Sequence, residues 1–393
     1  MPQPLSGIKV LALEQAVSLP LATRYMADLG ADVIKIERPD GGDFARGYDS
    51  HVKGQSTYFV WLNRGKRSLT LNLKDQRSQE IARRLAADAD VFVQNLGPGV
   101  AERLGLGADD LRAQNDRLIY CGLTGYGKTG PYAHKKAYDL LLQGESGLVA
   151  TSGTPDEPAK VGISAVDISG GMYVLIGVLT ALFERGSTGV GKVVDVSLID
   201  TIGEWMQVPY LYTTHTGNPF PRAGTRHNMI LPYGPYRCGE DGSINLAIQN
   251  NREWARFSEQ VLDDRSLIDD VRFTNNENRV ENADALADAI ESRFGALGID
   301  EVRARLERAD VPFGELREVS DAAEHPQFAA RNRWMDADSP GGPIRLLRFP
   351  VEAEGWETTG ARIPALGEHT NAILREIGLE DDAIAELHRD GAV

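Results

Sequence analysis

The feature that most constrains this chain is a regular alternation of short apolar runs and amphipathic segments through its first half. Residues 7–13 form an apolar run rich in strand-forming side chains, and residues 32–36 form another. Between them, residues 21–29 have helical spacing and end at Gly30, a residue that often terminates helices. This order predicts a βαβ unit with parallel strands and a right-handed crossover.

The same alternation continues to about residue 213. Further strands are predicted at 68–73, 90–94, 117–121 and 192–196, and further helices at 79–87, 108–115, 137–143, 168–185 and 198–213. Gly189 and Gly191 would end the long apolar helix at 168–185. So many strand–helix repeats predict an α/β fold, with a doubly wound, Rossmann-like parallel sheet.

The composition changes near residue 215, where Gly, Pro, Thr and Arg become frequent. After it, runs at 233–238 and 243–248 flank Glu240-Asp241-Gly242 and predict a hairpin, which charged helical stretches follow. The last part is extended from about residue 345 and then helical at 370–377. We therefore expect a large α/β domain at 1–215, a smaller α+β domain at 216–325, and a segment at 326–393 that returns to the large domain.

Charge and composition narrow the possible partners. The formal net charge of −15 argues against binding to nucleic acid or an anionic membrane. A local cluster of Arg and Lys can still bind phosphates, because salt limits the reach of exposed charges to about 8 Å. The first nine residues lack the layout of a signal peptide, and no apolar run approaches ~20 residues, so we expect a cytoplasmic protein without a transmembrane helix.

The metal-binding side chains form no recognisable pattern. Cys121 and Cys238 lie far apart, which argues against a disulfide framework or a cysteine metal site. The seven histidines are scattered without the spacing of paired ligands. We therefore expect no bound metal.

Two nucleotide-binding patterns are incomplete. Glu37 ends the second predicted strand, where an acid would hold a ribose, but the first turn lacks the G-x-G-x-x-G sequence of dinucleotide sites. Residues 122–129, Gly-Leu-Thr-Gly-Tyr-Gly-Lys-Thr, match the phosphate-loop pattern. Gly130-Pro131 follows and opposes the helix that such a loop must enter, so we interpret these residues as a glycine-rich surface or active-site loop.

A series of motifs in a specific order is similar to the class III CoA-transferases, the family of formyl-CoA transferase, carnitine-CoA transferase and α-methylacyl-CoA racemase. The resemblance covers nearly the whole chain. The matching segments are residues 29–37, 63–68, 95–99, 124–127, Asp167 before Gly170-Gly171, 192–197 and 366–370.

The resemblance places the nucleophile at Asp167. From the residues alone, Asp167 precedes the predicted helix at 168–185 and would be its N-cap, where the helix dipole would keep the carboxylate ionised. The family's mechanism implies that Asp167 attacks an acyl-CoA thioester to form a mixed anhydride, which CoA then converts to an aspartyl-CoA thioester. The partners implied are acyl-CoA and a small carboxylic acid, with coenzyme A as substrate and no permanently bound cofactor.

The resemblance also implies a set of residues that contact CoA: Gln15, Ala16, Arg38, Leu71, Lys74, Asn95, Leu96, Gly97, Arg103, Thr124, Gly125, Tyr126 and Lys128. Of these, Arg38, Lys74 and Arg103 are suited to bind phosphates. Residues 224–228 occupy the place of the family's mobile active-site loop but lack the glycine run of formyl-CoA transferase. Lys128 stands where that enzyme has a loop glutamate, and both departures argue against formyl or oxalyl specificity.

Three other interpretations remain. A racemase would use a His beside an Asp as a base, but this chain has Tyr138 before Asp139, and a tyrosine with a pKa near ~10 is a poor base at neutral pH. Asp139 is kept as a second candidate for a catalytic role. A non-catalytic CoA-binding protein and a phosphate-loop NTPase are weaker alternatives. The resemblance further implies an interlocked, ring-like homodimer.

Overall fold

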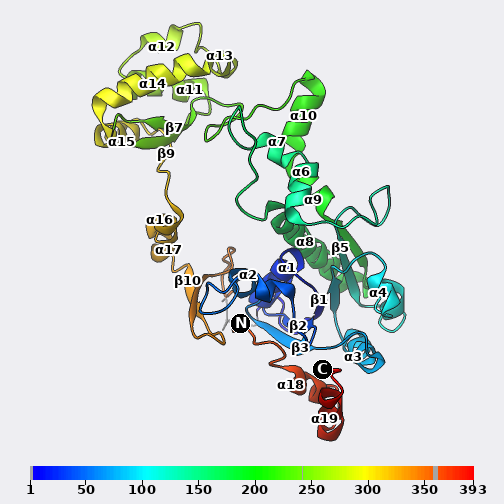
Figure 1. Cartoon of the computed structure of the whole chain (residues 1–393). Coiled ribbons are helices and arrows are strands. Elements are labelled where there is room, and N and C mark those ends of the chain that lie inside the picture. Colours follow the sequence, from blue (N-terminus) through cyan, green and yellow to red (C-terminus); the bar gives the residue numbers. More distant parts are fainter. Residues whose placement is uncertain (1–2, 241, 357–361) are drawn as a thin grey trace. The chain divides into compact units, whose positions relative to one another are not determined.

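The structure is a computed structural model that describes residues 3–240, 242–356 and 362–393. These residues divide into two compact units (Figure 1). The first unit contains the chain up to Leu148 together with Val161–Tyr210 and Phe328–Val393. The second contains Val149–Lys160 and Leu211–Gln327.

The first unit is built on a six-stranded sheet with the order β3-β2-β1-β4-β5-β6. Each neighbouring pair is parallel. This strand order is that of a doubly wound dinucleotide-binding fold, and it confirms the predicted α/β class. The strands are β1 (Lys9–Leu13), β2 (Asp32–Glu37), β3 (Lys66–Thr70), β4 (Val91–Gln94), β5 (Ile119–Thr124) and β6 (Val193–Ser197).

Both faces of the central strands of this sheet are buried, which explains why β1, β4 and β5 are largely apolar. Alternate residues of β1 belong to different cores: Val10 and Ala12 pack with α1 (Ser18–Asp28) and α8 (Ala165–Thr188), whereas Leu11 and Leu13 pack with the helices of the other face. The helices of the second face include α3 (Gln76–Ala87), α5 (Ala108–Arg112), α18 (Thr370–Glu376) and α19 (Asp381–Arg389). The C-terminal helices α18 and α19 thus complete the core of the first unit.

The remaining elements of the first unit are short. They are η1 (Phe44–Gly47), α2 (Thr57–Leu62), α4 (Val100–Arg103), α6 (Asp139–Glu145), α9 (Leu198–Trp205), and the antiparallel pair β10 (Trp334–Ala337) and β11 (Ile344–Leu347).

The second unit has its own core around a three-stranded antiparallel sheet, β7-β8-β9. Its elements are β7 (Tyr233–Arg237), β8 (Ser243–Ala247), α11 (Asn251–Arg256), η2 (Phe257–Val261), α12 (Ser266–Asp269), α13 (Asn276–Glu281), α14 (Ala283–Leu297), α15 (Ile299–Arg308), β9 (Phe313–Gly314) and α16 (Val319–Ala323). Three of the four boundaries between the units fall within α7 (Leu148–Thr151), α10 (Gln207–Thr216) and α17 (Pro326–Ala330), and the fourth lies between Lys160 and Val161. The predicted hairpin is confirmed, although Asp241 of its turn lies outside the described residues.

Several predicted boundaries were wrong. The strand expected at 68–73 is β3 at Lys66–Thr70, and the helix expected at 198–213 is divided into α9 and α10. The most consequential error concerns α8, which begins at Ala165 with Ser164 as its N-cap. Asp167 therefore lies within the first turn of α8 and is not its N-cap. The long helix does end at Gly189, which has left-handed backbone, as predicted.

Helix α8 is unusual in its length and apolar composition. By these two criteria alone it would suffice to cross a membrane, with a mean hydropathy of 1.8 over an 18-residue window. The same criteria are met by core helices of soluble proteins, and α8 packs on α1, α9 and the strands β5 and β6. Part of its surface is nevertheless exposed, including Met172, Ile176 and Phe183.

Candidate active site

The turn that joins β1 to α1 is the centre of the candidate site. It consists of residues 14–17, and Ala16 within it has a φ of 66°. This left-handed conformation is unfavourable for any residue with a Cβ atom, because Cβ approaches the following carbonyl oxygen. The turn leads directly into α1, whose first residue is Ser18. Ligands of open α/β sheets bind at this carboxyl edge, beside the strands where the order reverses.

Buried charged side chains support the turn. Glu14 Oε1 accepts hydrogen bonds from Lys66 Nζ at 2.6 Å and Lys35 Nζ at 3.3 Å. Lys35 Nζ also lies 2.8 Å from Asp43 Oδ2, and all four side chains are buried. Burial lowers the pKa of Lys66 to about 7, against the opposing effect of Glu14. Such a cluster is stable only when every member is paired, so the contacts fix the loops that carry them.

Asp167 lies next to this turn. Its Oδ1 accepts a hydrogen bond of 2.6 Å from the hydroxyl of Ser18, the first residue of α1. Burial raises the pKa of Asp167 to about 6, the Ser18 hydrogen bond opposes this rise, and Asp139 adds to it. The expectation that the helix dipole would set the ionisation of Asp167 therefore needs correction, because desolvation has the larger effect. The carboxylate still predominates at pH 7.

Asp139 performs the capping that was expected of Asp167. It is the first residue of α6, and its Oδ1 accepts hydrogen bonds from the backbone amides of Val166 at 2.9 Å and Asp167 at 3.2 Å. Its Oδ2 accepts a hydrogen bond of 2.7 Å from Gln143. Asp139 therefore caps α8 from a neighbouring helix. This arrangement leaves the side chain of Asp167 free to contact Ser18.

A pair of glycines allows α8 to approach the turn. A Cβ atom on Gly171 would lie 2.5 Å from the backbone oxygen of Ser18, and one on Gly170 would lie 2.4 Å from Leu198 Cδ2. Any larger residue would push α8 away from α1 or α9. The Gly170-Gly171 pair is therefore the sequence signal that places Asp167 against Ser18.

Aromatic side chains surround the same carboxylate. Tyr48 and Tyr58 stack edge to face at 5.7 Å, and the Tyr58 hydroxyl lies 3.5 Å from Ser164 Oγ. Burial, with a smaller contribution from the nearby Asp43 and Asp167, raises the pKa of Tyr48 to about 12. Tyr138 is exposed beside the start of α6. These rings form a partly apolar border around Asp167.

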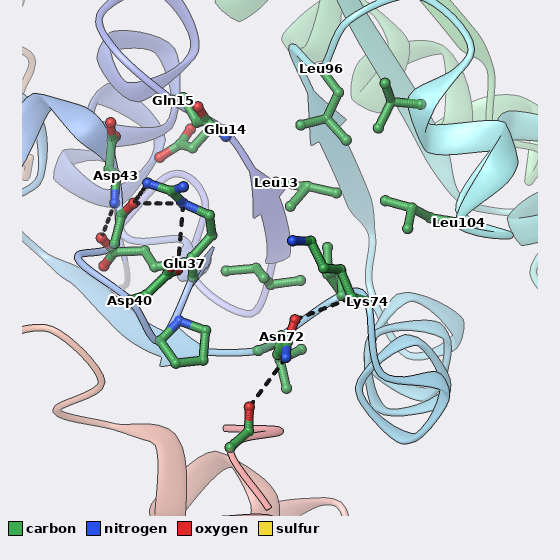
Figure 2. A pocket seen from close by; sticks show the side chains of 18 residues that line it. Leu13, Glu14, Gln15, Glu37, Asp40, Asp43, Asn72, Lys74, Leu96 and Leu104 are labelled. Atoms are coloured by element: carbon green, nitrogen blue, oxygen red, sulfur yellow. Dashed lines mark hydrogen bonds and ion pairs between the residues drawn. The ribbon is translucent and has the colours of Figure 1, made fainter.

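A cavity of ≈ 520 Å³ lies beside the β1–α1 turn (Figure 2). Figure 2 shows Leu13, Leu96 and Leu104 on one side and Glu14, Asp43 and Glu37 on the other. The amine end of Lys74 reaches into the space near Leu13. The cavity thus combines an apolar wall with acidic side chains and with the cationic Arg38 and Lys74, and its volume is typical of small-molecule sites.

Comparisons with known proteins identify the family of this chain. The model of CoA-transferase family III matches residues 5–370. The chain belongs to this family. It is 35% identical to the acetyl-CoA:oxalate CoA-transferase of Acetobacter aceti, over 95% of each chain. It is 33% identical to the human succinyl-CoA:glutarate CoA-transferase, over all of this chain and 90% of the relative.

Solved structures agree with the assignment. A CAIB/BAIF family protein from Brucella suis superposes with a TM-score of 0.81 at 34% identity, covering 96% of this chain and all of the other. A hypothetical protein from Mycobacterium tuberculosis superposes with a TM-score of 0.82 at 30% identity, covering 95% and 99%. The resemblance seen in the sequence is thereby confirmed, and the protein is a family III CoA-transferase.

The structure brings together only some of the residues expected to contact CoA. Gln15, Arg38, Leu71, Lys74 and Leu96 line the cavity. Two others adjoin it: Ala16 lies in the turn, and Asn95 exchanges hydrogen bonds of 3.0 and 2.9 Å with the backbone of Gln15. Gly97 lies in the connection that follows β4, and Arg103 ends α4, close to Gly99.

The four remaining expected residues lie at or after the end of β5 and are not among those that line the cavity. They are Thr124, Gly125, Tyr126 and Lys128. Tyr126 donates a hydrogen bond of 2.8 Å to Glu145, and Lys128 forms an exposed ion pair with Asp195. No helix begins within this segment before α6 at Asp139, so the phosphate-loop match is a surface connection, as expected.

Residues 224–228, matched to the family's mobile loop, belong to the second unit. There Arg226 forms an ion pair of 3.2 Å with Glu291, and the ring of His227 stacks on Tyr233 at 5.1 Å.

Glu37 is fully engaged in structural contacts. Its two oxygens accept hydrogen bonds from Arg46 at 2.8 and 2.7 Å and from Ser68 at 2.6 Å, and these partners lower its pKa to about 2 against the effect of burial. This carboxylate is already paired and is poorly placed to hold a ribose. The decision against a dinucleotide site therefore has a physical basis beyond the missing glycines.

Sequence reasoning missed three contributors. Ser18 and Asp43 are brought to the site by the tertiary structure, and Gly391 lines the cavity from the far end of the chain. The carbonyl oxygen of Ala392 accepts a hydrogen bond of 2.8 Å from the amide of Asn72, which ties this segment to the strand side of the cavity. Only Ser18 left a signal in the sequence, as a polar residue at the start of a helix.

Proposed function

We propose that this enzyme moves CoA from an acyl-CoA thioester to a free carboxylic acid through covalent intermediates on Asp167. The observation that carries the proposal is the placement of Asp167, a partly buried carboxylate that contacts Ser18 directly after the β1–α1 turn, whose residues Glu14 and Gln15 line the cavity. A pKa of about 6 favours nucleophilic attack, since the carboxylate is more basic than that of an ordinary Asp and yet predominates at pH 7.

The first half of the reaction transfers the acyl group and then CoA. An oxygen of Asp167 attacks the thioester carbonyl, the carbon–sulfur bond breaks, and CoA thiolate leaves a mixed anhydride. The thiolate then attacks the aspartyl carbonyl and expels the donor acid as its carboxylate. The products are an aspartyl-CoA thioester and the donor carboxylate, so that charge and protons balance.

The second half reverses these steps with a new acid. The acceptor carboxylate attacks the aspartyl carbonyl and releases CoA thiolate, which forms a second mixed anhydride. The thiolate attacks the acceptor's acyl carbon and returns Asp167 as a carboxylate. The N-terminal turn of α1 would stabilise the oxyanions, because a helix N-terminus carries about half a positive charge. One thioester replaces another, so the sequence of steps requires neither ATP nor metal.

The cavity is proposed to hold the nucleotide part of CoA. Arg38 and Lys74 are its cationic lining residues, and they would pair with phosphates. Leu13, Leu71 and Leu96 would cover apolar parts of the ligand. Coenzyme A would act as a substrate and leave after each cycle.

Short carboxylic acids are the proposed acceptors, with dicarboxylic acids first. Relatives are named for oxalate, glutarate and D-citramalate as acids and for acetyl-CoA and succinyl-CoA as donors. The departures at Lys128 and residues 224–228 argue for testing longer dicarboxylic acids before oxalate.

We further propose a cytoplasmic homodimer with interlocked chains and the domain division 1–215, 216–325 and 326–393. The exposed side chains of Met172, Ile176 and Phe183 on α8 support an oligomer, since this apolar surface would be covered by another copy. Light scattering on the purified protein would test this, and a monomer mass at micromolar concentration would contradict it.

A donor–acceptor screen with mass-spectrometric detection tests the activity. We expect CoA to move between acids and Asp167→Asn to reduce the rate by at least about 10³-fold, because the nucleophile is lost. Asp200→Asn is a matched control, since Asp200 also lies in the first turn of a helix and pairs with a serine hydroxyl, that of Ser197. Hydroxylamine added during turnover should convert Asp167 to a hydroxamate.

Two results would contradict the proposal: an Asp167→Asn enzyme that transfers CoA at the normal rate, or a hydroxamate at another residue. Exchange of the α-proton in heavy water without CoA transfer would instead favour racemisation. That alternative would need a base at Tyr138 or Asp139, and the carboxylate of Asp139 is already occupied by the amides of α8.

A further inference from the structure

Strain in the β1–α1 turn is concentrated at one residue. Ala16 has left-handed backbone, whereas the glycines that adopt this conformation elsewhere do so without cost. Strain of this kind persists only when the surrounding structure enforces it, and it is found preferentially at functional sites. The turn must therefore be held by contacts stronger than the preference of alanine for negative φ.

Asp43 supplies those contacts. Its Oδ1 accepts hydrogen bonds from the amide of Ala16 at 3.1 Å and from that of Ala45 at 2.9 Å. Its Oδ2 lies 2.8 Å from the ammonium of Lys35, and the side chain is buried. Because both oxygens are engaged in a dry environment, the carboxylate cannot rotate without leaving a buried charge unpaired.

The held turn acts directly on the proposed nucleophile. Ser18 follows Ala16 by two residues and donates its hydroxyl hydrogen bond of 2.6 Å to Asp167. The backbone oxygen of Ser18 also lies where a Cβ on Gly171 would clash, at 2.5 Å, so α1 and α8 leave little room for adjustment. A change in the φ of Ala16 would swing Ser18 and the first turn of α1 away from Asp167.

We propose that Asp43 is a positioning residue for CoA transfer, which holds Ala16 in its left-handed conformation so that Ser18 and the N-terminal turn of α1 face Asp167. The inference rests on the proposed role of Asp167. It assigns to the buried cluster a task beyond stability, namely the alignment of the turn with the reacting carboxylate.

A rescue experiment tests the proposal on the full-length enzyme. Asp43→Ala should lower kcat more than it changes KM for acyl-CoA, because the cationic residues Arg38 and Lys74 and the leucines that line the cavity remain. Adding Ala16→Gly to Asp43→Ala should raise kcat by about 5- to 30-fold, since glycine adopts the left-handed conformation without the strain of alanine. A merely structural role for Asp43 would give no such specific rescue.

Asp28→Ala is the matched control. Asp28 is a buried carboxylate at the other end of α1, paired with Arg24 at 2.7 Å and Arg64 at 2.8 Å. It should lower thermal stability as Asp43→Ala does, while the folded enzyme keeps its kcat within about threefold of wild type. All rates are measured well below the melting temperature of each variant.

Hydrogen exchange provides a measurement that does not depend on activity. The amide of Ala16 should exchange faster in Asp43→Ala than in Asp28→Ala, because only the former loses its acceptor. If the wild-type enzyme transferred no CoA, the proposed function would fail while this measurement would still test the support of the turn. Equal exchange in the two variants, or a double variant no faster than Asp43→Ala, would overturn the inference.

Discussion

Two connections at the carboxyl edge of the same sheet differ in how they are built. The β1–α1 turn, residues 14–17, has no glycine, contains a strained alanine and rests on buried charges. The connection after β5 contains Gly125, Gly127 and Gly130, and its ion pairs are exposed. In sequence, the glycine-rich connection resembles a binding loop more closely. In the structure, Glu14 and Gln15 of the β1–α1 turn line the cavity, and Ser18, the residue directly after the turn, contacts Asp167.

The difference shows two ways to obtain an unusual backbone conformation. Glycine allows it locally but leaves the chain free to take other conformations as well. An ionic cluster imposes it from outside, at the expense of burying charges that must all be paired. The second solution suits a turn whose geometry must stay constant during a reaction. It leaves almost no signature in the local sequence.

The largest expected effect is on the support of the β1–α1 turn. Glu14→Gln would leave Lys66 without a charged partner in a buried site and would remove one of the two carboxylates beside Lys35, and we expect a loss of about 3–5 kcal/mol in the free energy of unfolding. Glu145→Gln is the control for the other connection, because Glu145 in α6 forms an exposed pair with Lys135 that should contribute little to stability. Denaturant titration measures both. Equal losses would remove the contrast between the two connections.

The pH dependence of the rate sharpens the role of Asp167. Its pKa is raised to about 6 in the folded enzyme and the carboxylate is the reactive form, so kcat/KM should be flat above that pH. Below it, the rate should fall about tenfold per pH unit. Ser18→Ala should move this limb to higher pH, because it removes a hydrogen bond that stabilises the carboxylate. Asp139→Asn should move it to lower pH, since it removes a like charge while keeping an acceptor for α8. If neither substitution shifted the acidic limb of the pH–rate profile, the titration would belong to another group.

The ionised carboxylate of Asp167 is needed for activity, but it should lower the stability of the folded enzyme. A carboxyl whose pKa is raised on folding destabilises the folded state above its folded pKa, and this cost disappears as the pH falls toward its unfolded value near 4. Asp167→Asn should therefore raise the free energy of unfolding at pH 7–8 by on the order of 1–2 kcal/mol, given ~1.4 kcal/mol per pKa unit and partial solvation. The gain should shrink toward pH 4. Calorimetry at several pH values would show this, and a destabilised Asn variant at pH 8 would contradict it.

The smallest effect is expected in the connection after β5. Lys128→Met breaks an exposed pair with Asp195, in which both side chains are about half exposed, and should change stability by ~0–1 kcal/mol. If Lys128 nevertheless contacts CoA, as the resemblance implies, the same variant should raise KM for acyl-CoA. A large loss of stability would show that this connection is supported in the same way as the β1–α1 turn.

Much of the fold was readable from hydrophobic periodicity. The strands β1, β4 and β5 are mainly apolar runs, because both faces of the sheet are buried at these central positions. Boundaries were less readable where side-chain preferences and packing disagree. The strand β3 begins at Lys66, a residue that strand propensity does not favour. The lysine is nevertheless buried there, because its ammonium group is paired with Glu14.

The candidate site was only partly readable. Asp167 was found through the order of the family's motifs, but the prediction that it is the N-cap of its helix was wrong. The helix begins earlier, and Asp139, 28 residues away, caps it. Ser18, Asp43 and Gly391 reach the site from three separate parts of the chain. Short-range patterns cannot report such contacts, because no fixed spacing relates these residues.

The sequence pattern and the tertiary structure therefore determine different properties of this protein. Apolar alternation and glycine placement specify a doubly wound sheet, since they act through the local geometry of strands and helix ends. The order of the motifs specifies the family and the acidic residue that would carry the chemistry. The ionisation of Asp167, the strain at Ala16 and the pairing of Glu14, Lys35, Asp43 and Lys66 emerge only when distant segments pack together. Burial and charge pairing are properties of the assembled interior, where removal from water makes each unpaired group costly.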